Sequence, residues 1–487
     1  MSVESVVSPQ PNSRLYNKDL APTGSAQRTW TFYSYLSLWV GMAQCVPTLM
    51  MAGGMIALGM NWIQAWFTII LGNVIVLIPI LLNSHPGTKY GIPFPVFART
   101  SFGTNGANIV AVMRALVAAG WFGIESVIGG SSINAFLTGI FPAWSNLNRG
   151  DFLGQSLSGW ICFLLFWAFN VYIIYHGMET VRKYLSWAAP IIFVLGVGLF
   201  VWSVSAAHGF GPLFEQPTKF GTFGSFMPVF IPSLTGVIAF WATLSLNIPD
   251  FTRFSKSQTD QMLGQTLGLP PAMAYASLVG IVATSASMIV FGKALWNPVD
   301  LLGHFHNPVI LFLSLFAITV ATLAVNVGAN VVSPAYDISN LAPGRISFQT
   351  GGLITAVIGL LFMPWKLLSS PHVYIFDWLG TYSGFLGPIA GVLIADYWAV
   401  RRTRIDVPEL YSPIGIYSYK NGFNPGAVAA LVCGIVLALI GAFVPALVWL
   451  YNYAWFTGFV VSFLVYWFYM KSAGVKLGRS GEISLGE

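Results

Sequence analysis

Long apolar stretches separated by short polar segments run along almost the whole chain. An α-helix needs about 20 mostly apolar residues to cross the hydrocarbon core of a bilayer. The pattern predicts twelve such helices, at residues 30–58, 62–83, 105–137, 158–178, 184–204, 226–248, 269–292, 308–334, 350–370, 373–399, 425–447 and 450–470. We therefore expect an all-α integral membrane protein that crosses the bilayer many times.

Basic residues are distributed unevenly between the two sides that these spans define. Twelve spans place both termini on one side, and most of the 22 lysines and arginines fall on that side. Loops on the opposite side contain only Arg149, Lys219, Lys293 and Lys366, while Arg114 lies near the start of the third span. Because Lys and Arg are retained in the cytoplasm, we predict a multi-pass protein of the cell membrane with both termini cytoplasmic.

Composition supports a membrane protein and excludes several other classes. Hydrophobic residues make up 56% of the chain and charged residues 8%, against about 25% charged residues in soluble domains. The net charge of +6 comes from basic residues scattered over short loops, so we expect membrane lipid and no nucleic acid as a partner. Cys45, Cys162 and Cys433 lie far apart in apolar segments and are interpreted as packing residues. The sequence shows no metal-ligand spacing, cofactor motif or nucleophile–base pair, which predicts no metal, no cofactor and no enzyme.

Proline and glycine interrupt the first and sixth spans. Pro47 and the pair Gly53–Gly54 lie in the first span, and Pro228, Pro232 and Gly236 lie in the sixth. These residues can produce ordinary kinks in membrane helices. They can also mark a pair of discontinuous helices in matching positions of two inverted five-helix repeats, an arrangement in which the substrate binds where the broken helices meet. The tenth span would then end the second repeat, and the last two spans would be additions.

A carboxylate in the stretch "WFGIES" is unusual for its depth in the membrane. Glu125 lies about 20 residues into the third span, where an unpaired charge is costly unless it is protonated or faces a cavity. Trp121 precedes it by four residues and so shares its helical face, as do Arg114 and Gly129. A buried glutamate can also hold two helices together through hydrogen bonds. The neighbouring tryptophan favours a role in a binding site.

Other polar and aromatic residues at membrane depth extend this candidate site. Trp241 in the sixth span is too deep for an interfacial anchor, so Trp121 and Trp241 could sandwich a flat ring. Asn326 and Asn330 are four residues apart in the eighth span, and an amide offers both a donor and an acceptor to a heterocycle edge. These asparagines could instead bond only to other helices. Asp377, early in the tenth span, is a second candidate for carrying a proton.

Several longer motifs resemble those of the first nucleobase–cation symport family, whose members move nucleobases, allantoin and hydantoins. The similarity runs from about residue 17 to about residue 463. Its most specific parts are "HPGTKYGIPFPVFARTSFG" (85–103), "WFGIE" (121–125), "FWATLSLNIPDFTRF" (240–254), "NVGANVVSPAYDISN" (326–340) and "LGPIAGVLIADYWAVRR" (386–402). The resemblance implies a leucine-transporter-like core of inverted five-helix repeats with two additional helices.

The resulting division of the chain has six parts. We expect a polar cytoplasmic tail without much structure at 1–28, a first repeat at 29–204 and a second, inverted repeat at 205–400. A cytoplasmic loop at 401–424, two additional helices at 425–470 and a cytoplasmic tail at 471–487 follow.

The resemblance also implies roles for individual residues. Trp121 and Trp241 would stack on the two faces of a planar heterocycle, and Glu125 and Asn330 would bond its edge. Gln44 and Phe240 belong to the same implied substrate site, and Leu379 on the tenth span would be a gating residue beside it. Members that select hydantoin or allantoin often carry Gln in place of Glu125, whereas plant-type members with Glu take adenine, guanine or uracil. Since a carboxylate can accept two ring N–H bonds, the sequence favours a nucleobase, uracil first, over allantoin.

The expected coupling ion is a proton rather than sodium. Sodium-coupled relatives use hydroxyl oxygens on the eighth span, and the corresponding residues here are Ala324 and Val325. Sodium is a hard cation that needs oxygen ligands, so we predict proton coupling through Glu125, with Asp377 as the alternative carrier. The leading hypothesis is a secondary transporter that imports a nucleobase by alternating access. A passive facilitator for the same solutes is the second hypothesis.

Overall fold

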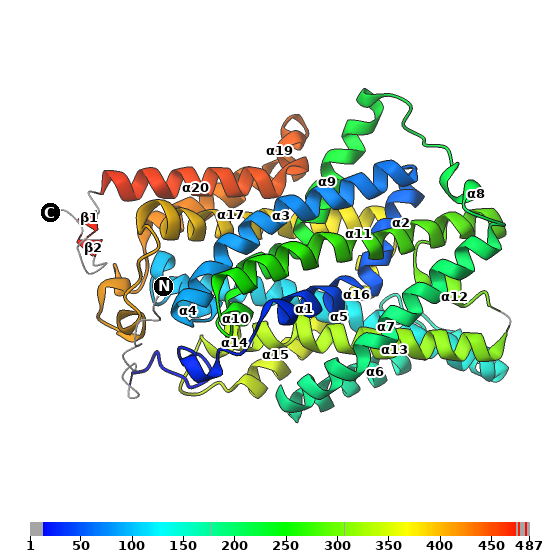
Figure 1. The fold of residues 1–487 in the computed structure, drawn as a ribbon, viewed down its shortest axis with the longest axis horizontal. Helices are drawn as coiled ribbons and strands as arrows, with labels where there is room; N and C mark the ends of the chain where they lie inside the picture. The colour runs from blue at the N-terminus through cyan, green and yellow to red at the C-terminus, as the bar shows by residue number, and fades with distance from the viewer. Residues whose placement is uncertain (1–12, 177, 306, 474–475, 478–482, 485–487) are drawn as a thin grey trace.

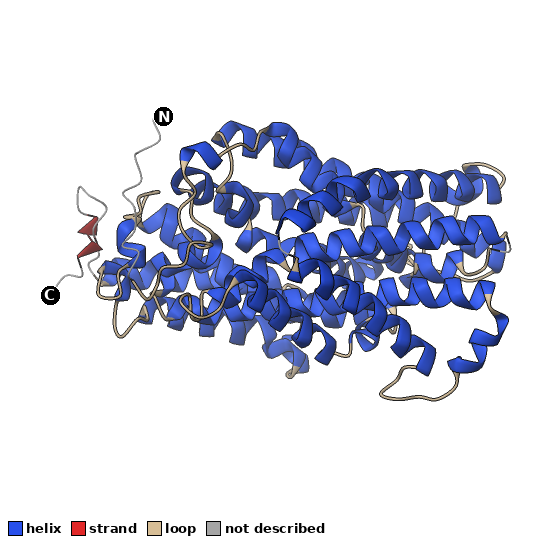
Figure 2. Cartoon of the chain, turned by 90° about the horizontal axis from the view of Figure 1, so that it is seen from below, coloured by secondary structure: helices blue, strands red, loops and turns tan. Residues whose placement is uncertain are grey.

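The structure, a computed structural model, is a bundle of long helices. It describes residues 13–176, 178–305, 307–473, 476–477 and 483–484. Helices run roughly parallel to the long axis of the molecule, and most connecting loops gather at its two ends (Figures 1 and 2). The end of α20 (Ala454–Ser472), the helix α4 (Phe94–Phe102) and the loop 401–424 lie at one end, which we call the tail end. The helix α8 (Gly211–Phe214) lies at the other, which we call the far end.

The remaining elements fall into long helices and short connecting ones. The long helices are α1 (Phe32–Ala43), α2 (Val46–Leu58), α3 (Trp62–Tyr90), α5 (Gly106–Ile140), α6 (Leu157–Tyr175), α7 (Met178–Ala206), α9 (Phe223–Asn247), α11 (Gln258–Phe291), α13 (Pro308–Asn330), α15 (Phe348–Leu361), α17 (Gly380–Ile394) and α18 (Pro425–Leu439). The short ones are α10 (Pro249–Thr252), α12 (Pro298–Leu302), α14 (Val332–Ser339), α16 (Pro364–Leu367), α19 (Val448–Asn452), and η1 to η8 at Ser25–Gln27, Pro142–Asn148, Val373–Leu379, Ala395–Val400, Pro408–Tyr411, Ile416–Ser418, Ile440–Ala442 and Pro445–Leu447. Two-residue strands β1 (Lys476–Leu477) and β2 (Ile483–Ser484) pair antiparallel.

The described helices confirm a multi-pass helical membrane fold. Eight are long and apolar enough to cross a bilayer, and two bent pairs raise the number to ten. The predicted spans at 184–204 and 350–370 coincide with shorter apolar helices, Phe193–Ala206 within α7 and Phe348–Leu361. The count of twelve spans and the division into two repeats at residue 204 therefore stay predictions.

The predicted interruption of the first span is confirmed. Helix α1 ends at Ala43 and α2 begins at Val46, and their axes differ by 54°. Pro47 lies in the first turn of α2, where its missing N–H costs no helical hydrogen bond. Gln44 and Cys45 form the break itself.

The predicted break in the sixth span is wrong. Helix α9 runs without interruption from Phe223 to Asn247, through Pro228, Pro232 and Gly236. A single proline in a membrane helix frees only one or two backbone groups, which neighbouring turns can satisfy, so the helix continues. The eighth span instead contains a local irregularity, where Val331 (φ −117°, ψ −47°) separates α13 from α14 directly after Asn330, although Pro308–Ser339 still forms a single candidate span.

The expectation of an unstructured amino-terminal tail is also wrong for its second half, while residues 1–12 lie outside the described part. Residues 13–28 cross the tail end of the bundle and contact several elements there. Asn17 Nδ2 donates to the carbonyl of Pro343 at 2.8 Å, and Arg28 Nη1 donates to that of Thr88 at 2.9 Å. The carboxy-terminal tail, predicted at 471–487, is described only in part.

A buried ion pair joins the loop 401–424 to the helices beneath it. Arg401 Nε lies 2.7 Å from Asp396 Oδ2, and both side chains are fully buried. Arg401 Nη2 also donates to the carbonyl of Thr100 at 2.6 Å, and Tyr466 donates to Asp396 Oδ1 at 2.8 Å. These bonds connect η4, the end of α4 and α20, so buried polar contacts hold the tail end of the bundle together.

Candidate functional site

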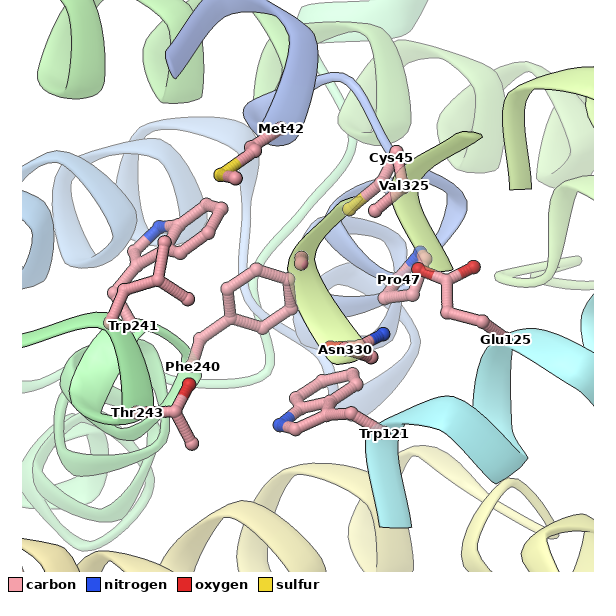
Figure 3. Close-up of a pocket in the computed structure, with 12 residues that line it drawn as sticks. Met42, Cys45, Pro47, Trp121, Glu125, Phe240, Trp241, Thr243, Val325 and Asn330 are labelled. Carbon is pink, nitrogen blue, oxygen red and sulfur yellow. The ribbon is translucent and has the colours of Figure 1, made fainter. Parts of the chain in front are cut away.

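A small cavity lies where α1, α2, α5, α9 and α13 meet. Its volume is about 30 Å³, enough for a few water molecules at most. All of its twelve lining residues are buried: Met42, Cys45, Pro47, Trp121, Glu125, Phe240, Trp241, Thr243, Leu244, Val325, Ala329 and Asn330 (Figure 3). The cavity thus adjoins the interruption of the first span and the interruption after Asn330.

Aromatic rings form one wall of the cavity. The ring of Phe240 lies 5.1 Å from that of Trp121 and 5.0 Å from that of Trp241, centroid to centroid. Both contacts are edge-to-face, with interplanar angles of 74° and 80°. Trp39 of α1 packs edge-to-face on Trp241 at 5.1 Å. The two predicted tryptophans therefore flank the same space, and Phe240 lies between them (Figure 3).

Tyr382 of α17 fixes the orientation of Trp121. The indole Nε1 of Trp121 donates to the Tyr382 hydroxyl at 3.2 Å, and this hydroxyl donates to the carbonyl of Ala239 at 2.9 Å. Tyr382 is 3% exposed, so both bonds form away from water. Tyr382 was not among the residues predicted from the sequence, although it lies three residues after Leu379 and so on the same helical face.

Glu125 is the charged residue of the cavity. Its side chain is 2% exposed, and in the described part of the chain its Oε2 has no hydrogen-bond partner. In Figure 3 its carboxyl group points toward Cys45 and Pro47 at the break of the first span. Three helical turns separate Glu125 from Arg114, which pairs elsewhere. The carboxyl group is therefore available to a ligand or a proton.

A ladder of asparagines holds Asn330 in place. Asn330 Nδ2 donates to Asn326 Oδ1 at 3.1 Å, and Asn326 Nδ2 lies 3.2 Å from Asn170 Oδ1 of α6. Asn326 also donates to the carbonyl of Phe122 on α5 at 3.2 Å. Asn326 thus has the helix-bonding role that the sequence left open, and it presents Asn330 to the cavity.

Three predicted site residues, Gln44, Leu379 and Asp377, lie outside the cavity lining. Gln44 turns toward Gly196 of α7, where an added Cβ would lie 4.0 Å from Gln44 Oε1. Leu379 is fully buried beside Gly236 of α9, in the π-helical turn η3. Cys45, interpreted from the sequence as packing, belongs to the lining instead.

Asp377 has surroundings unlike those of Glu125. Its side chain is 57% exposed, and its Oδ2 lies 3.8 Å from His372 Nδ1. It stands on the opposite side of η3 from the buried residues of that turn, so it does not face the cavity.

Buried charged residues lie between the cavity and the tail end of the bundle. Arg114 of α5 lies 3.1 Å from Asp337 of α14, and both side chains are fully buried. Each is seven residues, or about two helical turns, from a cavity residue, Trp121 and Asn330 respectively. Asp250 of α10, 3% exposed, accepts a hydrogen bond from the Phe94 backbone N–H at 2.8 Å. The cavity-lining helices α5, α9 and α13 thus lead, directly or through α10 and α14, to a layer of buried charged residues.

Aromatic groups close the opposite side of the cavity. The Tyr374 hydroxyl of η3 donates to the carbonyl of Pro47 at 3.1 Å. The ring of Trp296 lies 6.2 Å from that of Tyr374, and its backbone lies against Gly53 of α2. Buried polar contacts and aromatic contacts therefore lie on the two sides of the cavity, toward the two ends of the bundle.

Comparison with known proteins identifies the family. A profile described as permease for cytosine/purines, uracil, thiamine, allantoin matches residues 22–465. The chain belongs to this permease family. It is a transporter of the nucleobase–cation symport type and not an enzyme.

Two curated relatives and one solved structure show how far the likeness extends. The permease is 43% identical to the allantoin permease of Bacillus subtilis (strain 168), over 94% of each chain. It is 41% identical to the purine-uracil permease NCS1 of Arabidopsis thaliana, over 95% of this chain and 79% of the relative. Its fold matches Mhp1, a nucleobase-cation-symport-1 family transporter solved in a closed conformation with bromovinylhydantoin bound, with a TM-score of 0.76 and 25% identity over 94% and 96% of the two chains.

Replacing Tyr382 with Phe tests whether its hydroxyl orients Trp121 for ligand binding. The variant leaves the Trp121 N–H without its acceptor, so we expect affinity for the transported ring to fall several-fold. Binding to purified protein in detergent measures this. Tyr451→Phe is the matched control, since that hydroxyl bonds the carbonyl of Phe376 outside the cavity. If Tyr382→Phe binds the ring with the same affinity as Tyr451→Phe, the role of Tyr382 is contradicted.

Proposed function

We propose that the permease imports a nucleobase-type planar heterocycle, uracil first, together with a proton and by alternating access. The observation that carries the proposal is Glu125, a buried carboxyl group with an unpartnered oxygen in an aromatic-lined cavity. We further propose that it works in the cell membrane, with both termini in the cytoplasm, from the distribution of its basic residues.

The cavity lining supports a planar, hydrogen-bonding substrate. Trp121 and Trp241 offer faces for stacking, while Glu125 and Asn330 offer polar groups to the edge of a ring. Apolar walls with a few polar groups are the usual composition of small-molecule sites. The packed contacts on both sides of this small cavity support a carrier that encloses its substrate rather than a passive facilitator with a continuous pore.

The absence of side-chain oxygens at two positions of the eighth span supports proton coupling. Ala324 and Val325 offer no side-chain oxygen to sodium, and Val325 lines the cavity with its methyl groups. Thr322 is the nearest hydroxyl in sequence; it is 1% exposed and its Oγ1 has no partner among the described residues. A single carboxyl group can bind a proton, whereas a sodium ion needs several oxygen ligands.

Allantoin is the second candidate substrate. The observation that favours it is the 43% identity to the allantoin permease of Bacillus subtilis across 94% of both chains. Allantoin contains a nearly flat hydantoin ring with a ureido substituent and offers several N–H and carbonyl groups, so the same aromatic and polar lining could bind its ring. Titration of uracil, adenine, guanine, cytosine, allantoin and hydantoin against the purified protein ranks the candidates.

Trp121→Ala and Trp241→Ala test the stacking of the substrate. Stacking of a base on an aromatic side chain contributes roughly 1–3 kcal/mol, so each change should weaken binding on the order of tenfold or more. Trp449→Ala, a change of an exposed tryptophan on α19, serves as the control. Unchanged affinity in both cavity variants, with intact folding by thermal unfolding, would refute stacking between them.

Replacing sodium with choline tests the coupling ion. Because Ala324 and Val325 supply no oxygen, affinity and uptake in choline buffer should equal those in sodium buffer. Uptake into proteoliposomes with matched ionic strength gives the comparison. A clear rise of affinity with sodium would overturn proton coupling and would indicate that Thr322 and backbone carbonyls bind the ion.

Glu125→Gln separates recognition from coupling. Gln keeps the size and one accepting oxygen but cannot release a proton, so the variant should retain substrate exchange and shift toward allantoin-like rings. It should lose accumulation driven by an inward proton gradient, measured in proteoliposomes. Glu215→Gln, an exposed glutamate after α8, is the control. Accumulation by Glu125→Gln with the wild-type pH profile would remove Glu125 from the coupling step.

A further inference from the structure

The ring of Phe240 occupies the space between the two tryptophans of the cavity. It contacts Trp121 at 5.1 Å and Trp241 at 5.0 Å, in both cases edge-to-face. A substrate stacked on either indole would need to lie parallel to it, in the space that this perpendicular ring now fills. The remaining cavity of about 30 Å³ is too small for a heterocycle.

We propose that Phe240 is an internal plug of the substrate site, which leaves when a ring binds and limits the size of the ring that can replace it. The proposal rests on the proposed function, since it assumes a planar ring between Trp121 and Trp241. It goes further than the proposed function by giving Phe240 a competing role: the side chain occupies the substrate's place when no substrate is bound.

The chemistry of the phenyl group suits this competition. It is a six-membered planar ring, like a pyrimidine, so it can fill the same slot. An empty cavity lined by large apolar groups is destabilising, because the lining loses its contacts. The phenyl ring avoids that loss while offering no hydrogen bond to Glu125 or Asn330. A substrate with N–H and carbonyl groups supplies those bonds, which gives it an advantage over the plug.

The helix around Phe240 limits where the displaced ring can go. The residue one turn earlier on α9 is Gly236. The space beside Gly236 is already filled by η3, because an added Cβ there would lie 3.1 Å from the carbonyl oxygen of Ile375 and 3.6 Å from Leu379 Cδ1. A displaced Phe240 therefore cannot move far without a shift of η3, so it stays beside the site and limits the size of the ring that replaces it.

Phe240→Ala tests the plug through the size of the ligand. Affinities for uracil, with one ring, and adenine, with two fused rings, are measured on the full-length purified variant and on the wild type. We expect the ratio of adenine affinity to uracil affinity to rise at least tenfold in the variant. Phe240→Leu, which keeps an apolar side chain of smaller width, should give a smaller rise and replaces Phe240→Ala if that variant fails to fold.

Phe230→Ala is the matched control. It removes the same ring from the same helix, at a buried position that stacks on Phe67 away from the cavity. The ratio of adenine affinity to uracil affinity in Phe230→Ala should equal that of the wild type. An unchanged ratio in the Phe240 variants, or loss of all ring binding in them alone, would overturn the plug and leave the proposed function standing. Absence of any ring binding by the wild type would refute the proposed function and the plug together.

Discussion

Hydrocarbon cannot hydrogen-bond, and the rest of this structure depends on that constraint. Polar groups within the bundle must find partners inside the protein or remain costly. The Asn326 amide meets the demand by bonding α5, α6 and Asn330 of its own helix. Arg114 meets it only in part, because its Nη1 pairs with Asp337 while its Nε and Nη2 have no partner among the described residues. Glu125 Oε2 also has no partner there. Unlike the Arg114 atoms, the Glu125 carboxyl group belongs to a residue that lines the cavity, which supports its proposed role in binding.

The same constraint explains why the chain is interrupted where it is. The break at Gln44 and Cys45 and the interruption at Val331 both adjoin the cavity, and irregular backbone at membrane depth is tolerated where it lines a cavity. The interruption at Val331 also lies between the cavity residue Asn330 and the ion-paired Asp337. A shift of α14 relative to α13 would therefore move the Arg114–Asp337 ion pair and the Asn330 amide relative to each other, and such a movement would serve the proposed alternating access.

Sequence predicted most of the spans and much of the site, for a physical reason. Hydropathy reports the length of a buried helix directly, and i, i+4 spacing places Trp121 beside Glu125 on one face. Sequence failed where the outcome depends on neighbouring helices. Pro228 and Pro232 look as disruptive as Pro47, yet α9 continues through them. The interruption at Val331 has a signal in Pro334, three residues later, which has no N–H to bond the carbonyl of Asn330. Asp377 faces outward and Gln44 turns to α7, because helix rotation is set by packing that one sequence does not display. Tyr382 and the position of Phe240 depend on contacts between segments over 100 residues apart.

The composition of the cavity also limits which cation can accompany a substrate. Its lining consists of aromatic and aliphatic groups with one carboxyl group, one amide and one hydroxyl, that of Thr243. A metal cation would need several oxygens converging at fixed distances, and the methyl groups of Val325 and Ala329 stand where span 8 faces the site. A proton needs a single acceptor. When it is bound, the carboxyl group is neutral, tolerates the dry cavity and can donate to a carbonyl of the substrate. When it has left, the carboxylate can accept from a ring N–H. In the proposed function, one buried side chain would therefore serve both as the charge carrier and as a recognition group.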